Sequence, residues 1–219
     1  MDLKPPRVPD DTDALVERAG GGDSAALAEL FRRHRKRLRQ MVRLRLDRRL
    51  QGRVDPSDII QETYIDAARK ISEYARERSE LPFFLWLRLV AGERLLRVHR
   101  QHLGTVMRDA GREVSLYRGA LPQASSESLA AQLLGRLTSV SQKLIRAEVQ
   151  LQLQQALSEM DSMDREIIML RHFEELSNAE ASRVLGISPQ AASNRHMRAM
   201  SRLQSTLRNI PGLLDRAPS

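Results

Sequence analysis

Residues 176–207 read LSNAEASRVLGISPQAASNRHMRAMSRLQSTL, and this stretch predicts two short helices joined by a tight turn. Ser177 and Glu180 have the spacing of a capping box, in which each side chain bonds the backbone N–H of the other at the start of a helix. Gly186 suits the left-handed residue that ends this helix, and Pro189 suits the first turn of the next. The pattern is typical of a helix-turn-helix, whose second helix usually enters the DNA major groove.

The charge of the chain favours a polyanionic partner. The 219 residues carry a formal net charge of +8, and the isoelectric point is near 10.6. No acidic residue lies between Glu180 and Asp215, whereas five arginines do. This segment suits the phosphates of nucleic acid, although a solvated basic face has the same composition.

The composition argues against several other classes of protein. The chain contains no cysteine, which leaves no disulfide, no Cys-ligated zinc and no thiol nucleophile. The N-terminus lacks the apolar core of a signal peptide, and no apolar run approaches the ~20 residues of a membrane span. The histidines share no metal-ligand spacing with carboxylates, and no phosphate-binding loop or nucleophile elbow appears. We therefore expect a cytoplasmic protein without membrane insertion, enzymatic activity, cofactor or metal.

The fold predicted from these patterns is all-α, with two small helical domains joined by a flexible linker. Aromatic residues make up only 4% of the chain, and apolar residues recur at three- and four-residue steps. The predicted division is a flexible tail at 1–11, a first domain at 12–108, a linker at 109–140 with one short helix near Ser128 to Leu137, a second domain at 141–210 and a tail at 211–219.

Two helices of the predicted first domain carry contrasting charges. Asp58, Gln61 and Glu62 lie at positions i, i+3 and i+4, so they share one helical face that accepts charge-assisted hydrogen bonds. A solvated acidic face has the same spacing. The helix after Pro82 combines apolar residues with several arginines, which suit a cationic track along a single nucleic-acid strand. Trp86 within it suits either a core position or a stacking platform.

Three segments in order resemble a known family: AALAELFRRHRKRLRQMV at 25–42, DPSDIIQETYIDAARKI at 55–71 and DREIIMLRHFEELSNAEASRVLGIS at 164–188. They are similar to bacterial RNA polymerase sigma factors of the extracytoplasmic-function (ECF) group, which retain sigma domains two and four. The second segment matches the family pattern D-x-x-Q-E-x-aromatic. The segments HFEELSNAEA and GREVSLYRGALP further resemble planctomycete-type members.

The resemblance implies three sets of binding residues. The polymerase-binding set is Asp58, Ile59, Gln61, Glu62 and Tyr64. The set for the promoter −10 element is Trp86, Arg88, Arg94, Arg97 and Arg100. The set for the −35 element is Ser188, Pro189, Gln190, Ser193, Asn194, Arg195, Arg198 and Arg202. Gln and Asn suit adenine edges and Arg suits guanine. Leu89, Gly92 and Glu93 stand where the family commonly has Arg, Arg and Asn.

The function implied by the resemblance is to bind core RNA polymerase, through its clamp coiled coil and flap, and to direct promoter recognition, −10 melting and transcription initiation. Family members are often held by an anti-sigma factor, so such an inhibitor is a candidate partner. The alternative is a stand-alone helix-turn-helix regulator that binds duplex operator DNA at a two-fold symmetric site. That alternative gives the acidic helix and the basic aromatic helix no task.

Overall fold

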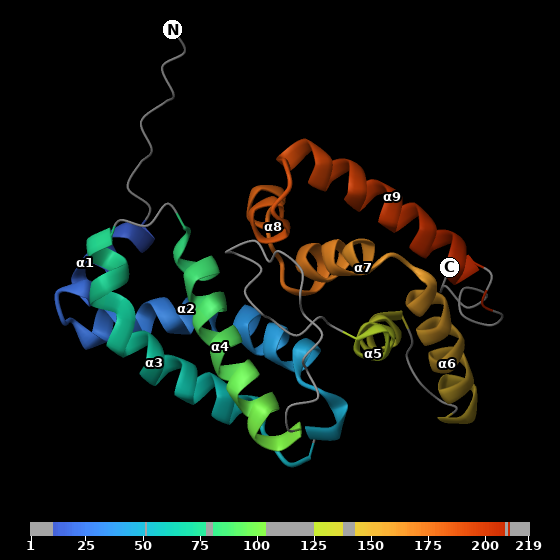
Figure 1. The fold of residues 1–219 in the computed structure, drawn as a ribbon, viewed down its shortest axis with the longest axis horizontal. Coiled ribbons are helices and arrows are strands. Elements are labelled where there is room, and N and C mark those ends of the chain that lie inside the picture. Colours follow the sequence, from blue (N-terminus) through green and yellow to red (C-terminus); the bar gives the residue numbers. More distant parts are fainter. Residues whose placement is uncertain are drawn as a thin grey trace, which may run out of the picture.

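The structure is a computed structural model that describes residues 11–50, 52–77, 81–103, 125–137, 143–208 and 210. All regular elements within these ranges are helical, which confirms the all-α prediction. Figure 1 shows two groups of helices side by side, with α1 to α4 in one and α5 to α9 in the other. In this part of the chain, no helix combines the length and the apolar composition that a membrane span requires. The two predicted tails, apart from Asp11, lie outside the described residues.

The first group is built on long amphipathic helices. Asp23 caps one of them by accepting hydrogen bonds from the backbone N–H groups of Ala25 and Ala26. Leu30 and Leu38 on that helix are completely buried in the core of the group. The elements are α1 (Asp11–Gly20), α2 (Ser24–Arg45), the 3-10 helix η1 (Arg48–Leu50), α3 (Pro56–Glu77) and α4 (Phe83–Leu103).

The second group contains the predicted helix-turn-helix. Asp161 caps the helix that precedes it, accepting from Met163 N at 2.8 Å and Asp164 N at 3.3 Å. That helix continues without a break into a π-helical turn. The elements are α5 (Ser126–Leu137), α6 (Lys143–Glu159), α7 (Ser162–Ile168), the π-helix η3 (Met169–Phe173), α8 (Asn178–Leu185) and α9 (Pro189–Arg208).

The short helix expected inside the linker is present as α5, and it belongs to a core. Leu129, Ala130 and Leu134 are at most 1% exposed. They share one apolar cluster with Leu153 and Leu157 of α6. The periodicity predicted the helix, but the many polar residues around it concealed that its apolar face is covered. Most of the predicted linker lies outside the described residues, and the domain boundaries stay predictions.

The two groups of helices are in direct contact. Leu44 of α2 and both Phe84 and Leu85 of α4 belong to the apolar cluster of the second group rather than to that of the first. Across the same boundary, the side-chain amides of Gln40 and Gln132 are hydrogen-bonded at 3.1 Å. The structure is therefore a closed arrangement in which α2 and α4 pack against the second group.

Candidate nucleic-acid interface

The helix-turn-helix forms because each of its ends is capped by local sequence. In the capping box of α8, Ser177 N donates to Glu180 Oε2 at 2.7 Å, and Glu180 N donates to Ser177 Oγ at 3.1 Å. Gly186 ends α8 with φ of +66°, a conformation that glycine adopts without strain. The amide of Asn178 donates to the carbonyl of Pro189 at 2.8 Å and ties the two helices together.

The structure brings most of the predicted −35 set onto the exposed side of α9. Ala192, Ala199 and Leu203 form the buried side of this helix. Ser193 and Arg195 are partly buried, and the remaining members of the set are exposed: Ser188, Pro189, Gln190, Asn194, Arg198 and Arg202. A 20-residue helix with one exposed polar and basic side has the size and charge to enter a major groove.

Two arginines of that set are held by one buried carboxylate, a contact that sequence reasoning missed. Asp164 of α7 is 4% exposed and accepts from Arg195 Nη1 at 2.6 Å and from Arg202 Nη1 at 2.8 Å. Arg195 also contacts Asp161 at 3.1 Å. Arg198 is exposed, and its guanidinium reaches only the carbonyl of Asn194, at 3.4 Å, among the described residues. Arg198 is therefore the arginine of the set most open to DNA.

A pair of histidines anchors α9 to η3. His172 and His196 approach Nε2 to Nε2 at 2.8 Å with their rings stacked. Burial lowers the pKa of His196, and the neighbouring His172 and Arg171 lower it further. The contact therefore favours a neutral His196 near pH 7, which permits a hydrogen bond between the two rings.

The acidic face of α3 is only partly free. Asp58 and Gln61 are exposed, whereas the carboxylate of Glu62 forms an ion pair with Arg94 of α4. Two other members of the predicted polymerase-binding set face the core. Ile59 is 1% exposed, and Tyr64 packs edge-on against Phe31 with ring centroids 5.1 Å apart.

An exposed isoleucine extends this face. Ile65 is 48% exposed and follows Gln61 by four residues, so it lies on the same side of α3 as Asp58 and Gln61. Sequence reasoning did not single it out, although an apolar residue at that spacing was the signal available. The combination of an exposed apolar group and acceptor groups suits a protein partner with basic donors.

The structure separates the arginines of the predicted −10 set. Arg97 bonds Asp66 of α3 at 2.8 Å, and Arg100 is exposed at the carboxyl-terminal end of α4. Trp86 is partly buried and stacks on Tyr74, with ring centroids 4.6 Å apart. Arg88 is 1% exposed and lies on the side of α4 that faces the second group. Arg88 is therefore buried in this arrangement, and its place in the −10 set stays a prediction.

Arg88 belongs to a buried ionic cluster of four side chains, Arg45, Arg88, Glu166 and Glu174. Arg45 donates to Glu174 Oε1 from Nε at 2.9 Å and from Nη2 at 2.5 Å, and Nη2 also lies 2.5 Å from Glu166 Oε1. Arg88 Nε donates to Glu174 Oε2 at 2.7 Å. Burial opposes ionisation of Glu174, but Arg45 and Arg88 outweigh it and lower the pKa of that carboxyl to about 2. The carboxyl of Glu174 is therefore ionised at pH 7, where it faces both arginines.

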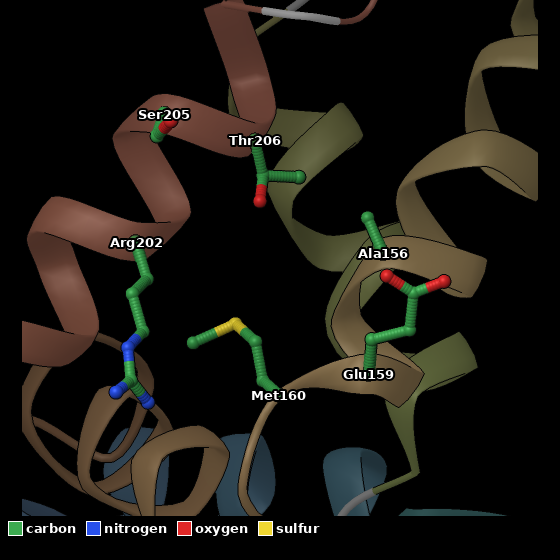
Figure 2. Close-up of a pocket in the computed structure, with 6 residues that line it drawn as sticks. All are labelled: Ala156, Glu159, Met160, Arg202, Ser205 and Thr206. Atoms are coloured by element: carbon green, nitrogen blue, oxygen red, sulfur yellow. The ribbon is translucent and has the colours of Figure 1, made fainter.

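A small open pocket lies between α6 and α9. It has a volume of about 370 Å³. Figure 2 shows Arg202 and Thr206 of α9 facing Met160 and Glu159 at the end of α6. The described residues contain no group of three or more His, Cys, Asp or Glu side chains that could hold a metal ion.

Comparison with known proteins links both groups of helices to one class. Residues 150–203 match the family model "Sigma-70, region 4". The chain is 27% identical over 199 residues to RNA polymerase sigma factor NccH of Alcaligenes xylosoxydans xylosoxydans, covering 90% of this chain and 95% of the relative. It is 24% identical over 202 residues to RNA polymerase sigma factor CnrH of Cupriavidus metallidurans, covering 91% and 96%.

The fold is also similar to a solved structure, that of CnrH in complex with the cytosolic domain of CnrY. The TM-score is 0.53 with 22% sequence identity, over 91% of this chain and 98% of that one. The curated relatives are RNA polymerase sigma factors, and the similarity to them spans both groups of helices. This supports a sigma factor of ECF type over a stand-alone regulator.

Proposed function

We propose that this chain is an ECF RNA polymerase sigma factor, which joins core polymerase in the cytoplasm and directs it to promoters. The observation that carries the proposal is the capped helix-turn-helix with an exposed basic α9, inside a chain similar to sigma factors over nine-tenths of its length. Polymerase, rather than this chain, would supply the catalysis. The wording of two sequence segments supports the finer assignment to planctomycete-type members.

The first group of helices would bind polymerase and the −10 element. Asp58 and Gln61 are exposed on α3, and Ile65 beside them adds apolar area. Carboxylate and amide oxygens there would accept hydrogen bonds from arginines of the clamp. Arg94, Arg97 and Arg100 of α4 would follow the phosphates of the opened strand.

The second group would read the −35 element as duplex DNA. Gln190 and Asn194 lie one turn apart on α9 and bond each other at 3.1 Å, so their amides are oriented together for adenine edges. Arg198 follows one turn later and suits guanine or a phosphate. Each group alone makes a small contact, so tight promoter binding would require both, linked through polymerase.

A candidate regulator follows from one relative. CnrH has been solved in complex with the cytosolic domain of CnrY. We infer that a binding protein, of the anti-sigma type that the family resemblance implies, is a candidate partner for this chain. Its binding would be detected as loss of polymerase association in a competition assay.

The test of the proposed function is reconstitution with sigma-free core polymerase and genomic DNA fragments. We expect co-elution with core polymerase and transcripts from specific starts. The variant Asp58→Ala with Gln61→Ala should weaken co-elution, whereas Glu73→Ala, an exposed acidic position farther along α3, should not. If the chain fails to associate with polymerase yet binds bare duplex DNA tightly, the stand-alone regulator is the better description.

A further inference from the structure

The exposed side of α2 carries positive charge for which the described residues provide no partner. No acidic residue lies between Glu29 and Asp47, whereas this stretch contains eight arginine and lysine residues. Four of the eight are exposed and form no ion pair with any described residue. We call these four side chains the cationic stripe: Arg35, Lys36, Arg39 and Arg43.

The cationic stripe runs along one side of the helix. Arg35, Arg39 and Arg43 follow one another at intervals of four residues, and Lys36 lies three residues before Arg39. At 3.6 residues per turn, all four fall within an arc of about 100°. From Arg35 to Arg43 the stripe is about 12 Å long, at about 1.5 Å per residue. The core of the first group lies on the other side of α2, where Leu38 is completely buried.

The fold itself gives this arrangement no purpose. Like charges three or four residues apart repel each other and destabilise a helix. Elsewhere on α2 such charges are neutralised, since Arg32 and Arg33 both donate to Glu29, at 2.7 and 2.8 Å. Arg39 has only a distant attraction to Asp55, without an ion pair. A row of unpaired cations is instead the pattern of a surface that binds a polyanion.

We propose that the cationic stripe binds the phosphate backbone of duplex DNA, as a sequence-independent contact in addition to those of α4 and α9. The proposal deepens the proposed function and rests on it for promoter DNA as the partner. A length of about 12 Å covers about four phosphates of one strand, at about 3.4 Å per phosphate. The number of cations in the stripe therefore matches the number of phosphates beside it.

Duplex DNA fits this surface better than a single strand does. Proteins that bind single strands without sequence preference stack bases on exposed aromatic rings. Phe31 of α2 is buried in the core of the first group, so it offers no such platform. Arginine side chains without aromatic neighbours suit contacts to phosphate oxygens alone, which position a duplex without reading its sequence.

The stripe ends close to the helix proposed to bind the −10 element. The backbone N–H of Asp47, two residues after the end of α2, donates to Nε2 of His99 on α4 at 3.2 Å. Arg100, the next residue along α4, is exposed and belongs to the −10 set. The DNA nearest to the stripe would therefore be the duplex that adjoins the −10 element.

The test measures how salt affects the binding of full-length protein to fluorescein-labelled duplexes, by fluorescence anisotropy. The stripe variant is Arg35→Gln with Arg39→Gln and Arg43→Gln. We expect it to reduce the slope of log affinity against log salt concentration by about 2.7, at about 0.9 per phosphate contact. Its affinity at low salt should fall by about tenfold or more, and by the same factor for an A·T-rich and a G·C-rich duplex.

A control variant separates a specific contact from a general loss of charge. Arg18→Gln with Arg69→Gln and Arg76→Gln removes the same net charge from exposed positions of α1 and α3. This control should leave the slope nearly unchanged, and circular dichroism should show equal helix content in both variants and the unmutated protein. An equal change of slope in the stripe variant and the control would overturn the proposal.

Three other outcomes would also overturn it. One is a larger loss of affinity for a single strand of the same length than for the duplex. Another is weaker binding to phosphatidylglycerol vesicles with unchanged duplex affinity, which would make the stripe a lipid-binding surface. The third is loss of co-elution with core polymerase at unchanged duplex affinity, which would make it a polymerase contact. Failure of the unmutated protein to associate with polymerase would instead overturn the proposed function, because the anisotropy measurement is made without polymerase.

Discussion

Glu174→Gln should lower the free energy of unfolding at pH 7 by about 3 kcal/mol. The substitution keeps the shape of the side chain but removes one of two negative charges, so Arg45 and Arg88 face only Glu166. Removal of one partner from a buried ion pair commonly costs about 3–5 kcal/mol. The pKa gives a similar figure, since its fall from 4.5 to about 2 corresponds to about 3 kcal/mol at about 1.4 kcal/mol per pH unit.

The pKa of Glu174 also fixes how the effect depends on pH. Because the folded pKa lies below the unfolded one, the stabilisation is complete above about pH 5 and is lost as the pH falls toward 2. The difference between the variant and the unmutated protein should therefore shrink steadily over this range. The partly exposed Glu29, whose pKa is lowered to about 2 by Arg32 and Arg33, is common to both proteins and leaves the difference unchanged.

Urea unfolding at several pH values would measure this effect. Trp86, the single tryptophan, reports the first group by fluorescence, and circular dichroism reports all helices. If the two groups of helices in the variant separate before they unfold, the slope of the free energy of unfolding against urea concentration should be smaller. The reason is that the interface between the groups is already exposed to solvent. Glu73→Gln, an exposed glutamate on α3, serves as the control. The reasoning is refuted if the free energies of unfolding of Glu174→Gln and the unmutated protein differ by less than about 0.5 kcal/mol at pH 7. It is also refuted if that difference stays constant down to pH 3.

Three further predictions concern other parts of the molecule. Gly20→Ala should destabilise the protein by about 1–3 kcal/mol, because the added Cβ would lie 2.5 Å from the Cβ of Ala75. Gly21→Ala, whose nearest new contact is at 3.4 Å, should change the unfolding midpoint little. Equal losses of stability in thermal unfolding of the two variants would contradict the packing argument. Asp164→Ala should free Arg195 and Arg202 and so strengthen non-specific duplex binding, measured by fluorescence anisotropy. Unchanged affinity would show that the two arginines are already available to DNA. Arg198→Ala should weaken duplex binding and reduce the slope of log affinity against log salt concentration by about 1. Arg76→Ala, at an exposed position on α3, should change neither quantity. An unaltered slope in the Arg198 variant would remove Arg198 from the DNA interface.

The helix-turn-helix was predictable because its determinants are local. Ser177, Glu180 and Gly186 act within a few residues of their own positions, and the structure has the capping box and the left-handed glycine that they predict. Hydrophobic periodicity likewise located the long helices. These features depend on backbone chemistry that neighbouring residues decide.

The ionic cluster was not predictable in the same way. Arg45 and Arg88 stand among many other arginines, and their partner Glu174 is 129 and 86 residues away in the sequence. One signal was available, since both arginines occupy positions where the helical period calls for an apolar residue. Arg45 follows Leu38, Met41 and Val42 on the buried side of α2. An arginine on an apolar stripe thus indicates a buried anionic partner, although the sequence does not say which.

The π-helical turn η3 has a consequence for comparison among related chains. Glu174 N bonds the carbonyl of Met169 at 2.9 Å, five residues back rather than four, so this turn holds one residue more than a regular α-helix. That extra residue allows the consecutive side chains of Phe173 and Glu174 both to be buried, one in the apolar cluster and the other in the ionic cluster. A one-residue deletion here would rotate everything after it by about 100° about the helix axis. Insertions and deletions at this single position would therefore divide homologous sequences into those that can bury a carboxylate at the position of Glu174 and those that cannot.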